Sequence, residues 1–325
     1  MATTESSISE YLQQAVYKFD LESEKLLKAF ENSVENRPIP EHIFHYTDDQ
    51  GLSGILESGT FRLTDIFRQN DPSELQHGLA VASNAIKSKI TDDNRELSDF
   101  SPRFERYCKN GGLEDSAHVF ISCFCADSDN LGQWRTYANN GHGFALGFRT
   151  DMLEKAFLDS NSQPKSSSFS TFPIEYDDYK LLKIQKSLVD HFQLALNLSR
   201  ELDQKSDRWK HYMASISSKF SVSALRAAIL FKHKAYENEN EYRFFQLFAA
   251  DQPLEGLKYT RKPSLLKGYL EFDWRKRCPK ALKKIVVGPA ADKTKAKNFV
   301  NDCLRAYNTT ENKIDVEYSD IPYRG

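Results

Sequence analysis

Short strand patterns and longer helical patterns alternate irregularly along this chain, and this mixture limits the folds that it can adopt. The strand patterns are rich in Val, Ile and Phe, but they do not follow one another in regular strand–helix–strand units. A doubly wound parallel sheet requires such units, so we expect an α+β fold around a mixed, mostly antiparallel β-core. Residues 91–117 and the Ser-rich residues 160–171 are expected to be loops, the first with one short helix. The expected strands cover residues 43–46, 60–64, 118–125, 143–148, 241–248, 269–272, 284–287 and 314–318.

Helical patterns lie at the N-terminus and in the middle of the chain. Residues 1–40 are expected to form a helical appendage, because apolar residues recur there at helical spacing until prolines end the pattern. Residues 181–202 and 209–234 predict two long helices, which form a helical insertion at 178–234. We therefore expect one α+β domain over residues 41–325, interrupted by this insertion.

Charge and cysteine content narrow the function classes. Lys and Arg total 44 and Asp and Glu total 46, so the net charge of −2 gives no overall attraction to nucleic acid or acidic lipid, and only a local basic groove stays open. Five cysteines without scaffold-like spacing or a CxxC pair indicate reduced thiols, a cytoplasmic protein and no metal site. No secretory leader and no membrane-spanning run is expected, and the oligomeric state is left open.

The segment Phe44-His45-Tyr46-Thr47 is the first candidate site. A lone histidine in an apolar strand is more often a core residue, but Tyr46 and Thr47 add a ring and two hydroxyls where the strand ends. A neutral imidazole can donate to or accept from a ribose hydroxyl. These residues predict a pocket at the strand end, with a buried core histidine as the alternative.

A second polar cluster follows at residues 70–74. Asp71 as N-cap, Pro72 at the first helical position and Glu74 at the third are typical of a helix start. Helix N-termini also bind phosphate, but two carboxylates oppose an anion. We expect Asn70, Asp71 and Glu74 to support the first candidate site rather than to contact phosphate.

Further polar groups lie in and after the expected strand at 118–125. Ser122 is either a small inward residue bonded to the backbone or a hydroxyl that binds a ligand. One helical turn cannot bury Trp134, Arg135 and Tyr137 on the same side. Either the two aromatic residues pack on the core while Arg135 faces solvent, or Arg135 points into a cleft toward an anion, which we favour.

Glu239, Glu241 and Arg243 form the other candidate centre. Strand alternation is expected to place all three on one face as the strand at 241–248 begins. An exposed set would be a surface ion pair of little consequence. In a buried set, Arg243 pairs with one carboxylate, and the other can bind a ribose hydroxyl or stabilise a glycosyl cation. No Walker, Rossmann, GxSxG or HExxH motif occurs.

Several of these segments, in the same order, resemble a bacterial family described only as a domain of unknown function (number twenty-nine seventy-one). The resemblance covers residues 42–325 approximately and implies no reaction. It rests on His45-Tyr46-Thr47, Asn70–Glu74, Ile121–Phe124, Gln133–Ala138, Gly141–Phe148, Glu239–Arg243, Ile285–Pro289 and Ser319–Arg324.

A more distant similarity is to ADP-ribosyltransferase-like folds, whose split β-core binds NAD. Those proteins carry a His or Arg on the first strand, a Ser, Thr or Tyr on a middle strand and a Glu on a late strand, and His45, Ser122 and Glu241 occur here in that order. The sequence departs from the pattern after Ser122, where Cys-Phe-Cys replaces a Ser-Thr-Ser run.

This second resemblance implies roles for the candidate residues. Glu241 would stabilise the glycosyl cation, His45 would hold the adenosine-side ribose and Glu239 would orient the acceptor. Tyr46 or Tyr137 would stack on nicotinamide, and Arg135 or Arg243 would meet phosphate. The cofactor-binding side chains so implied are Tyr46, Thr47, Ser122, Trp134, Arg135, Tyr137 and Arg243.

The leading hypothesis is an enzyme, an NAD-dependent ADP-ribosyltransferase or NAD glycohydrolase, with a nucleic-acid or protein acceptor and a setting in toxins or phage defence. A non-catalytic ligand-binding module is one alternative. The leading hypothesis requires His45, Ser122 and Glu241 to converge on one cleft and fails in this form if they do not. The other alternative is a metal-dependent nuclease or phosphodiesterase that uses Asp71, Glu74, Glu239 and Glu241.

Overall fold

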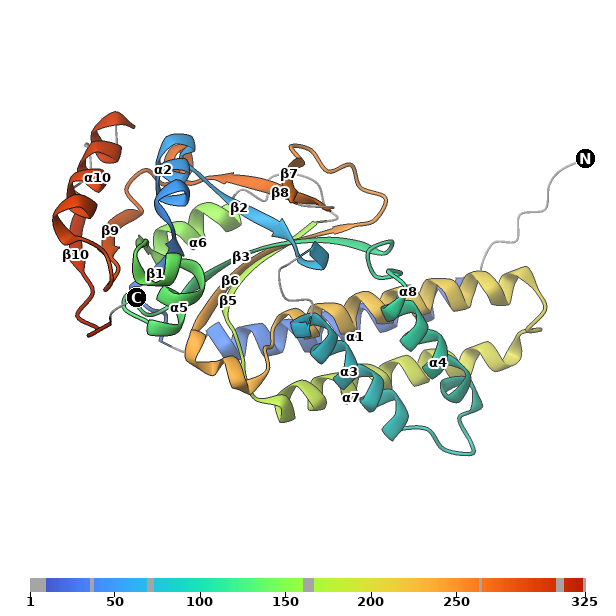
Figure 1. The fold of residues 1–325 in the computed structure, drawn as a ribbon. Helices are drawn as coiled ribbons and strands as arrows, with labels where there is room; N and C mark the ends of the chain where they lie inside the picture. The colour runs from blue at the N-terminus through green and yellow to red at the C-terminus, as the bar shows by residue number, and fades with distance from the viewer. Residues whose placement is uncertain are drawn as a thin grey trace, which may run out of the picture. The chain divides into compact units, whose positions relative to one another are not determined.

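The computed structural model describes residues 10–35, 38–68, 73–159, 167–262, 265–307 and 313–323 (Figure 1). The chain divides into two compact units. Unit 1 consists of Met1–Asn36, Asn70–His118 and Glu175–Lys234, and unit 2 of Arg37–Gln69, Val119–Ile174 and Ala235–Gly325. The expected N-terminal appendage and the expected insertion therefore fall in one unit. That unit also includes Asn70–His118, which lies between the strands expected at 60–64 and 118–125.

Unit 1 is helical. Residues 91–117, expected to be mostly loop, contain a helix of 15 residues, because Leu97, Phe100 and Phe104 recur at helical spacing and are buried. The helices of unit 1 are α1 (Glu10–Glu35), α3 (Ser73–Ser88), α4 (Arg95–Lys109), α7 (Asp178–Leu198) and α8 (Asp207–Ile229), with the 3₁₀ turn η3 (Ser199–Glu201).

Aromatic side chains form the core of unit 1. The Phe192 ring lies 4.5 Å from Phe220 and 4.6 Å from Phe100, and Phe19 lies 6.0 Å from Phe192. These rings come from α1, α4, α7 and α8, so burial of one aromatic cluster holds chain segments that are far apart in sequence.

Unit 2 contains a ten-stranded sheet, in which β10, β9, β4, β1, β3, β2, β8 and β7 are neighbours in that order. Strands β9 and β10 pair in parallel, and the strand pairs along the rest of this order are antiparallel. The strands are β1 (His42–Thr47), β2 (Thr60–Asp65), β3 (Ala117–Cys125), β4 (Phe144–Arg149), β5 (Ser167–Pro173), β6 (Glu241–Ala249), β7 (Lys258–Lys262), β8 (Leu265–Asp273), β9 (Leu282–Val287) and β10 (Asp315–Tyr318).

Helices of unit 2 connect and flank these strands. Figure 1 shows α10 beside β9 and β10 at the red end of the chain. The helices are α2 (Asp49–Ser58), α5 (Leu131–Tyr137), α6 (Thr150–Asp159), α9 (Trp274–Arg277) and α10 (Lys293–Ala306), with 3₁₀ turns η1 (Ile66–Arg68), η2 (Asn139–Gly141) and η4 (Lys234–Glu239). The expected α+β class with a mostly antiparallel sheet is confirmed.

Strand β5 corrects one expectation. The Ser-rich segment was expected to be a loop through residue 171, yet Ser167–Pro173 pairs with β6 over seven residues. Phe169 packs on Phe157 and Phe172 packs on Phe245, so the two rings lie on opposite faces of the strand. The segment therefore has no alternating pattern that could reveal the strand in the sequence.

The sheet forks at β3. Cys125 pairs with Phe44 of β1, whereas Ile121 and Phe120 pair with Thr64 and Asp65 of β2. Strand β6 also pairs with β3, so three strands meet this one. A strand has only two edges, so two of its neighbours must share an edge at different positions along it.

The two faces of this sheet differ, and we name each after one residue. The Phe124 face carries a large apolar cluster with Phe61, Phe124, Leu146 and Phe244, and helices α2, α6, α9 and α10 contribute side chains to it. The Glu241 face is the opposite one. It carries a smaller cluster that includes Phe44, Tyr46, Cys125 and Trp134.

Candidate functional site

His45 lies on the Phe124 face. It pairs across the strands with Leu146 of the large apolar cluster, and its ring centroid is 5.7 Å from that of Phe124. Nδ1 lies 3.4 Å from the Cys123 carbonyl oxygen, and burial lowers the pKa of the imidazole. His45 therefore lies among aromatic residues, in surroundings that disfavour its charged form.

Ser122 lies on the same face, between Phe120 and Phe124 along β3. Its exposed fraction is 4%, and its hydroxyl has no hydrogen-bond partner among the described residues. The expected bond to backbone is thus absent from this part of the chain. A buried hydroxyl without a partner carries a desolvation cost.

Glu241 and Arg243 lie on the opposite face, because they alternate along β6 with Tyr242 and Phe244 of the large cluster. Their exposed fractions are 5% and 3%. Nε and Nη2 of Arg243 each donate to Oε1 of Glu241 at 2.6 Å. The buried form of this pair, one of two forms expected from the sequence, is the one observed.

Strand alternation thus separates residues that were expected to converge. His45 and Ser122 point to the Phe124 face, whereas Glu241 points to the other, so the expectation that the three meet in one cleft is wrong. The local sequence could not reveal this, because Ile43, Phe44 and Tyr46 make both faces of β1 apolar. Only the register between strands assigns the faces.

Glu239 precedes the strand rather than continuing its alternation. It ends the 3₁₀ turn η4, and Asn240 has a φ of 43°, so alternation begins only at Glu241. The expectation that strand alternation places Glu239 on the same face as Glu241 and Arg243 is therefore wrong. Glu239 and Glu241 still lie near the same group, because both add to the effect of burial, which raises the pKa of Cys125 to about 12.

Two polar loops meet beside Glu241. The Ala126 amide donates to the Asn240 carbonyl at 2.8 Å, and the Asn240 side chain donates to Asp127 Oδ1 at 3.1 Å. Asn130 Nδ2 donates to the Asn238 carbonyl at 2.6 Å. Sequence reasoning missed these residues, although two Asx-rich stretches next to strand ends were a usable signal.

Tyr46 and Trp134, expected to bind a cofactor, support this loop instead. The Tyr46 hydroxyl donates to the Asp127 carbonyl at 2.8 Å and accepts from the Asn130 amide at 3.0 Å. Burial raises its pKa far above the usual range. Trp134 is fully buried, lies 4.7 Å from the Tyr46 ring, and donates from Nε1 to Asp129 at 2.6 Å.

Arg135, Tyr137 and Thr47 are less buried than Tyr46 and Trp134. Arg135 and Tyr137 are exposed, so the preferred expectation that Arg135 enters a cleft is wrong, and α5 buries only Trp134 of the three residues compared. Thr47 is half-buried against the first turn of α2, where a Cβ on Gly51 would lie 1.8 Å from its Oγ1. Asn70, Asp71 and the side chain of Glu74 lie outside the described residues.

A pocket of about 430 Å³ opens at the loop that follows β3. It is lined by Pro40, Glu41, His42, Phe44 and 126–129. His42 and Phe44 alternate with Ile43 of the large cluster, so the pocket lies on the Glu241 face. Burial lowers the pKa of His42, and Lys284 and Arg149 act in the same direction.

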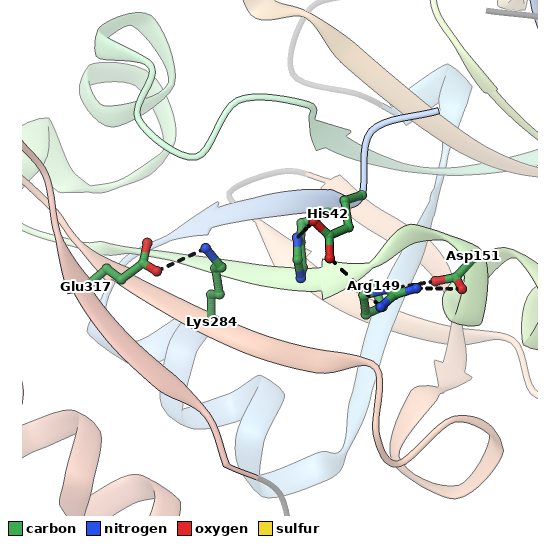
Figure 2. A network of polar contacts seen from close by, with 6 residues as sticks. His42, Arg149, Asp151, Lys284 and Glu317 are labelled. Atoms are coloured by element: carbon green, nitrogen blue, oxygen red, sulfur yellow. Dashed lines mark hydrogen bonds and ion pairs between the residues drawn. The ribbon is translucent and has the colours of Figure 1, made fainter. Parts of the chain in front are cut away.

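Charged side chains surround His42 (Figure 2). Arg149 donates to Asp151 through Nε at 3.0 Å and Nη2 at 2.8 Å, and Lys284 pairs with Glu317 at 3.0 Å. These exposed or half-buried pairs contribute little stability. They place charges of both signs around His42.

Two features are absent from the described part of the chain. No group of three or more His, Cys, Asp or Glu side chains could hold a metal ion there. No helix in the same residues has the length and apolar character needed to cross a bilayer.

Comparison with known proteins gives a family match for part of the chain. No curated protein and no solved structure matches it, so the ADP-ribosyltransferase-like resemblance stays a prediction. One family model matches, described as a protein of unknown function (DUF2971). The match covers residues 133–244, from α5 into β6, and includes Glu239, Glu241 and Arg243. The family resemblance predicted from the sequence is therefore confirmed over residues 133–244.

Proposed function

We propose that the chain is an NAD-consuming enzyme, an ADP-ribosyltransferase or NAD glycohydrolase, in which Glu241 is the catalytic carboxylate. One observation carries the proposal: a deeply buried carboxylate at the start of β6 is held by two N–H groups of Arg243. Burying an ion pair desolvates both charges, and apolar residues of similar size are often at least as stabilising. We infer that the pair serves chemistry rather than stability.

The reaction needs a negative charge beside a developing cation. The bond between nicotinamide and ribose C1′ breaks, and its electron pair leaves with nicotinamide. The ribose becomes an oxocarbenium-like cation, which a fixed carboxylate stabilises more than it stabilises the ground state. An acceptor, either water or a nucleophilic group of a partner, then bonds to C1′ and loses its proton.

Arg243 acts in this proposal as a positioning residue. Its guanidinium compensates the buried charge and fixes the orientation of Oε1. The loop contacts through Asn240 and Asp127 hold the start of β6 in place. Glu239, half-buried and near Glu241, is the residue proposed to orient the acceptor.

The separation of His45 and Ser122 from Glu241 removes the three-residue site that the leading hypothesis required, so the proposal depends on Glu241 and Arg243 and the other roles change. Tyr46 and Trp134 support the loop, and His45 contacts the apolar cluster, so none of these three is proposed to touch NAD. Tyr137 is exposed and keeps the proposed role of a ring that stacks on nicotinamide. The split β-core of the resembled folds is supported by the fork at β3.

Release of nicotinamide from NAD by the purified full-length chain tests the proposal. We expect measurable release, and we expect E241Q to lower its rate about 100-fold or more, the usual effect of removing one transition-state electrostatic contact. E237Q is the matched control, because Glu237 is an exposed carboxylate four residues earlier. Circular dichroism and the unfolding midpoint should show that both variants are folded.

Two outcomes would overturn the proposal. One is no nicotinamide release with water, protein or nucleic acid as acceptor. The other is equal release by E241Q and the unaltered chain. Activity on nucleic acid that a chelator abolishes would favour the metal-dependent alternative, and NAD binding without release would favour a binding module.

A further inference from the structure

The part of unit 2 from residue 256 to residue 300 is far more basic than the rest of the chain. It contains 13 Lys and Arg against 3 Asp and Glu, a net charge of +10, whereas the whole chain carries −2. The other residues together therefore carry −12. Such asymmetry within one chain is typical of a surface that meets a polyanion.

Six basic side chains of this stretch are exposed, and two of them, Arg277 and Lys293, lie over the rings of Phe272 and Tyr318. None of them forms an ion pair with any residue that the structure describes, unlike Lys258 and Lys284, which pair with Glu271 and Glu317. The six are Lys276, Arg277, Lys280, Lys293, Lys295 and Lys297. We call them the α9–α10 surface.

The two helices that carry five of the six residues cover the same face of the unit 2 sheet. Trp274 of α9 and Val300 of α10 both pack into the large apolar cluster, so both helices cover the Phe124 face and turn their exposed sides away from the sheet. Strand β9 separates the two helices in the chain. Its six residues span about 17 Å at the usual rise per residue, which suits a series of phosphates rather than a single one.

The three lysines of α10 are not explained by helix stability. Lys293, Lys295 and Lys297 occupy the first five residues of the helix, where the helix dipole disfavours cations. Asp292 caps this end by accepting from the Thr294 and Lys295 amides at 3.0 Å. An external anion would offset the charge that remains.

A nucleic acid fits this surface better than a membrane does. Binding to anionic lipid is usually completed by apolar side chains that enter the bilayer. Among the described residues from 267 to 307, no large apolar side chain is exposed. We propose that the α9–α10 surface binds the phosphate backbone of a nucleic acid. This inference goes beyond the proposed NAD chemistry and does not depend on it.

Fluorescence anisotropy with a labelled mixed-sequence DNA duplex, single-stranded DNA and RNA tests the inference on the full-length chain. The triple variants K276E/R277E/K280E and K293E/K295E/K297E should each weaken binding at least tenfold. Each should reduce the slope of log affinity against log salt concentration by about 2.7 for a duplex, the value for three lost phosphate contacts. Glutamates at the start of α10 also suit the helix dipole, so the second variant should fold.

R103E/R106E/K109E is the matched control. These three residues are exposed on α4 of unit 1, and their reversal changes the net charge by the same amount. The control should keep the salt slope of the unaltered chain. The inference is overturned if none of the three nucleic acids binds at low salt, if the control weakens binding as much as the test variants, or if only anionic vesicles are bound.

Discussion

The two faces of the unit 2 sheet carry different chemistry, although each holds buried side chains. The Phe124 face holds His45 and Ser122 among aromatic side chains. The opposite face holds Glu241 and Arg243 and, on β8, Lys267, which are the buried charged side chains of unit 2 among the described residues. A polar residue in a strand can therefore be assigned to a site only when the sheet face to which its side chain points is known.

The largest expected effect concerns the buried ion pair. Replacing Arg243 alone by leucine leaves the Glu241 carboxylate buried without its guanidinium, and we expect a loss of about 3–5 kcal/mol in the free energy of unfolding. The double variant E241L/R243L should recover most of that loss, because neither charge of this pair stays buried. Urea unfolding of the single and double variants measures both. A double variant less stable than R243L would show that the pair itself stabilises the fold.

A smaller effect is expected at the loop that positions β6. W134F removes the Nε1 donor to Asp129 and should lower the free energy of unfolding by about 1–3 kcal/mol. Tyr179 is exposed, so Y179F is a control that should leave stability unchanged. Equal unfolding midpoints for W134F and the unaltered chain would show that the Trp134 indole does not support the loop.

The Phe124 face predicts a pH dependence of stability. Burial lowers the pKa of His45 below its usual 6.5, so the unfolded chain binds more protons than the folded one below that pH. The free energy of unfolding should therefore fall as the pH falls below 6.5, and H45F should reduce the fall. Unfolding curves between neutral and acidic pH measure this. A fall of unchanged size in H45F would assign it to other groups, such as His42, whose pKa burial also lowers.

The smallest effect is expected at Ser122. Its hydroxyl is buried without a described partner, so S122A should be neutral or slightly stabilising. S319A, by contrast, removes a donor to Asp129 and should cost about 1 kcal/mol. A clear loss of stability in S122A would indicate a partner for this hydroxyl and would weaken the contrast between the faces.

Local patterns in the sequence predicted much of the fold. The strand at 118–125, the two long helices of the insertion and the pairing of Arg243 with a carboxylate two residues away all depend on near neighbours, and the structure contains each of them. The Ser-rich strand β5 was missed because its composition resembles a loop.

Long-range arrangement could not be predicted in the same way. Asn130 and Asn238 are bonded across more than 100 residues of chain, and nothing in either stretch specifies the other. The separation of His45 from Glu241 depends on register across β1, β3, β4 and β6. A shift of one residue in any of these strands would exchange the faces.

The most direct test compares one residue from each face in a single assay. Nicotinamide release from NAD should fall about 100-fold or more in E241Q, whereas H45F, on the other face, should stay within about threefold of the unaltered chain. Loss of activity in H45F as large as in E241Q, with both variants folded, would contradict the assignment of the site to the Glu241 face.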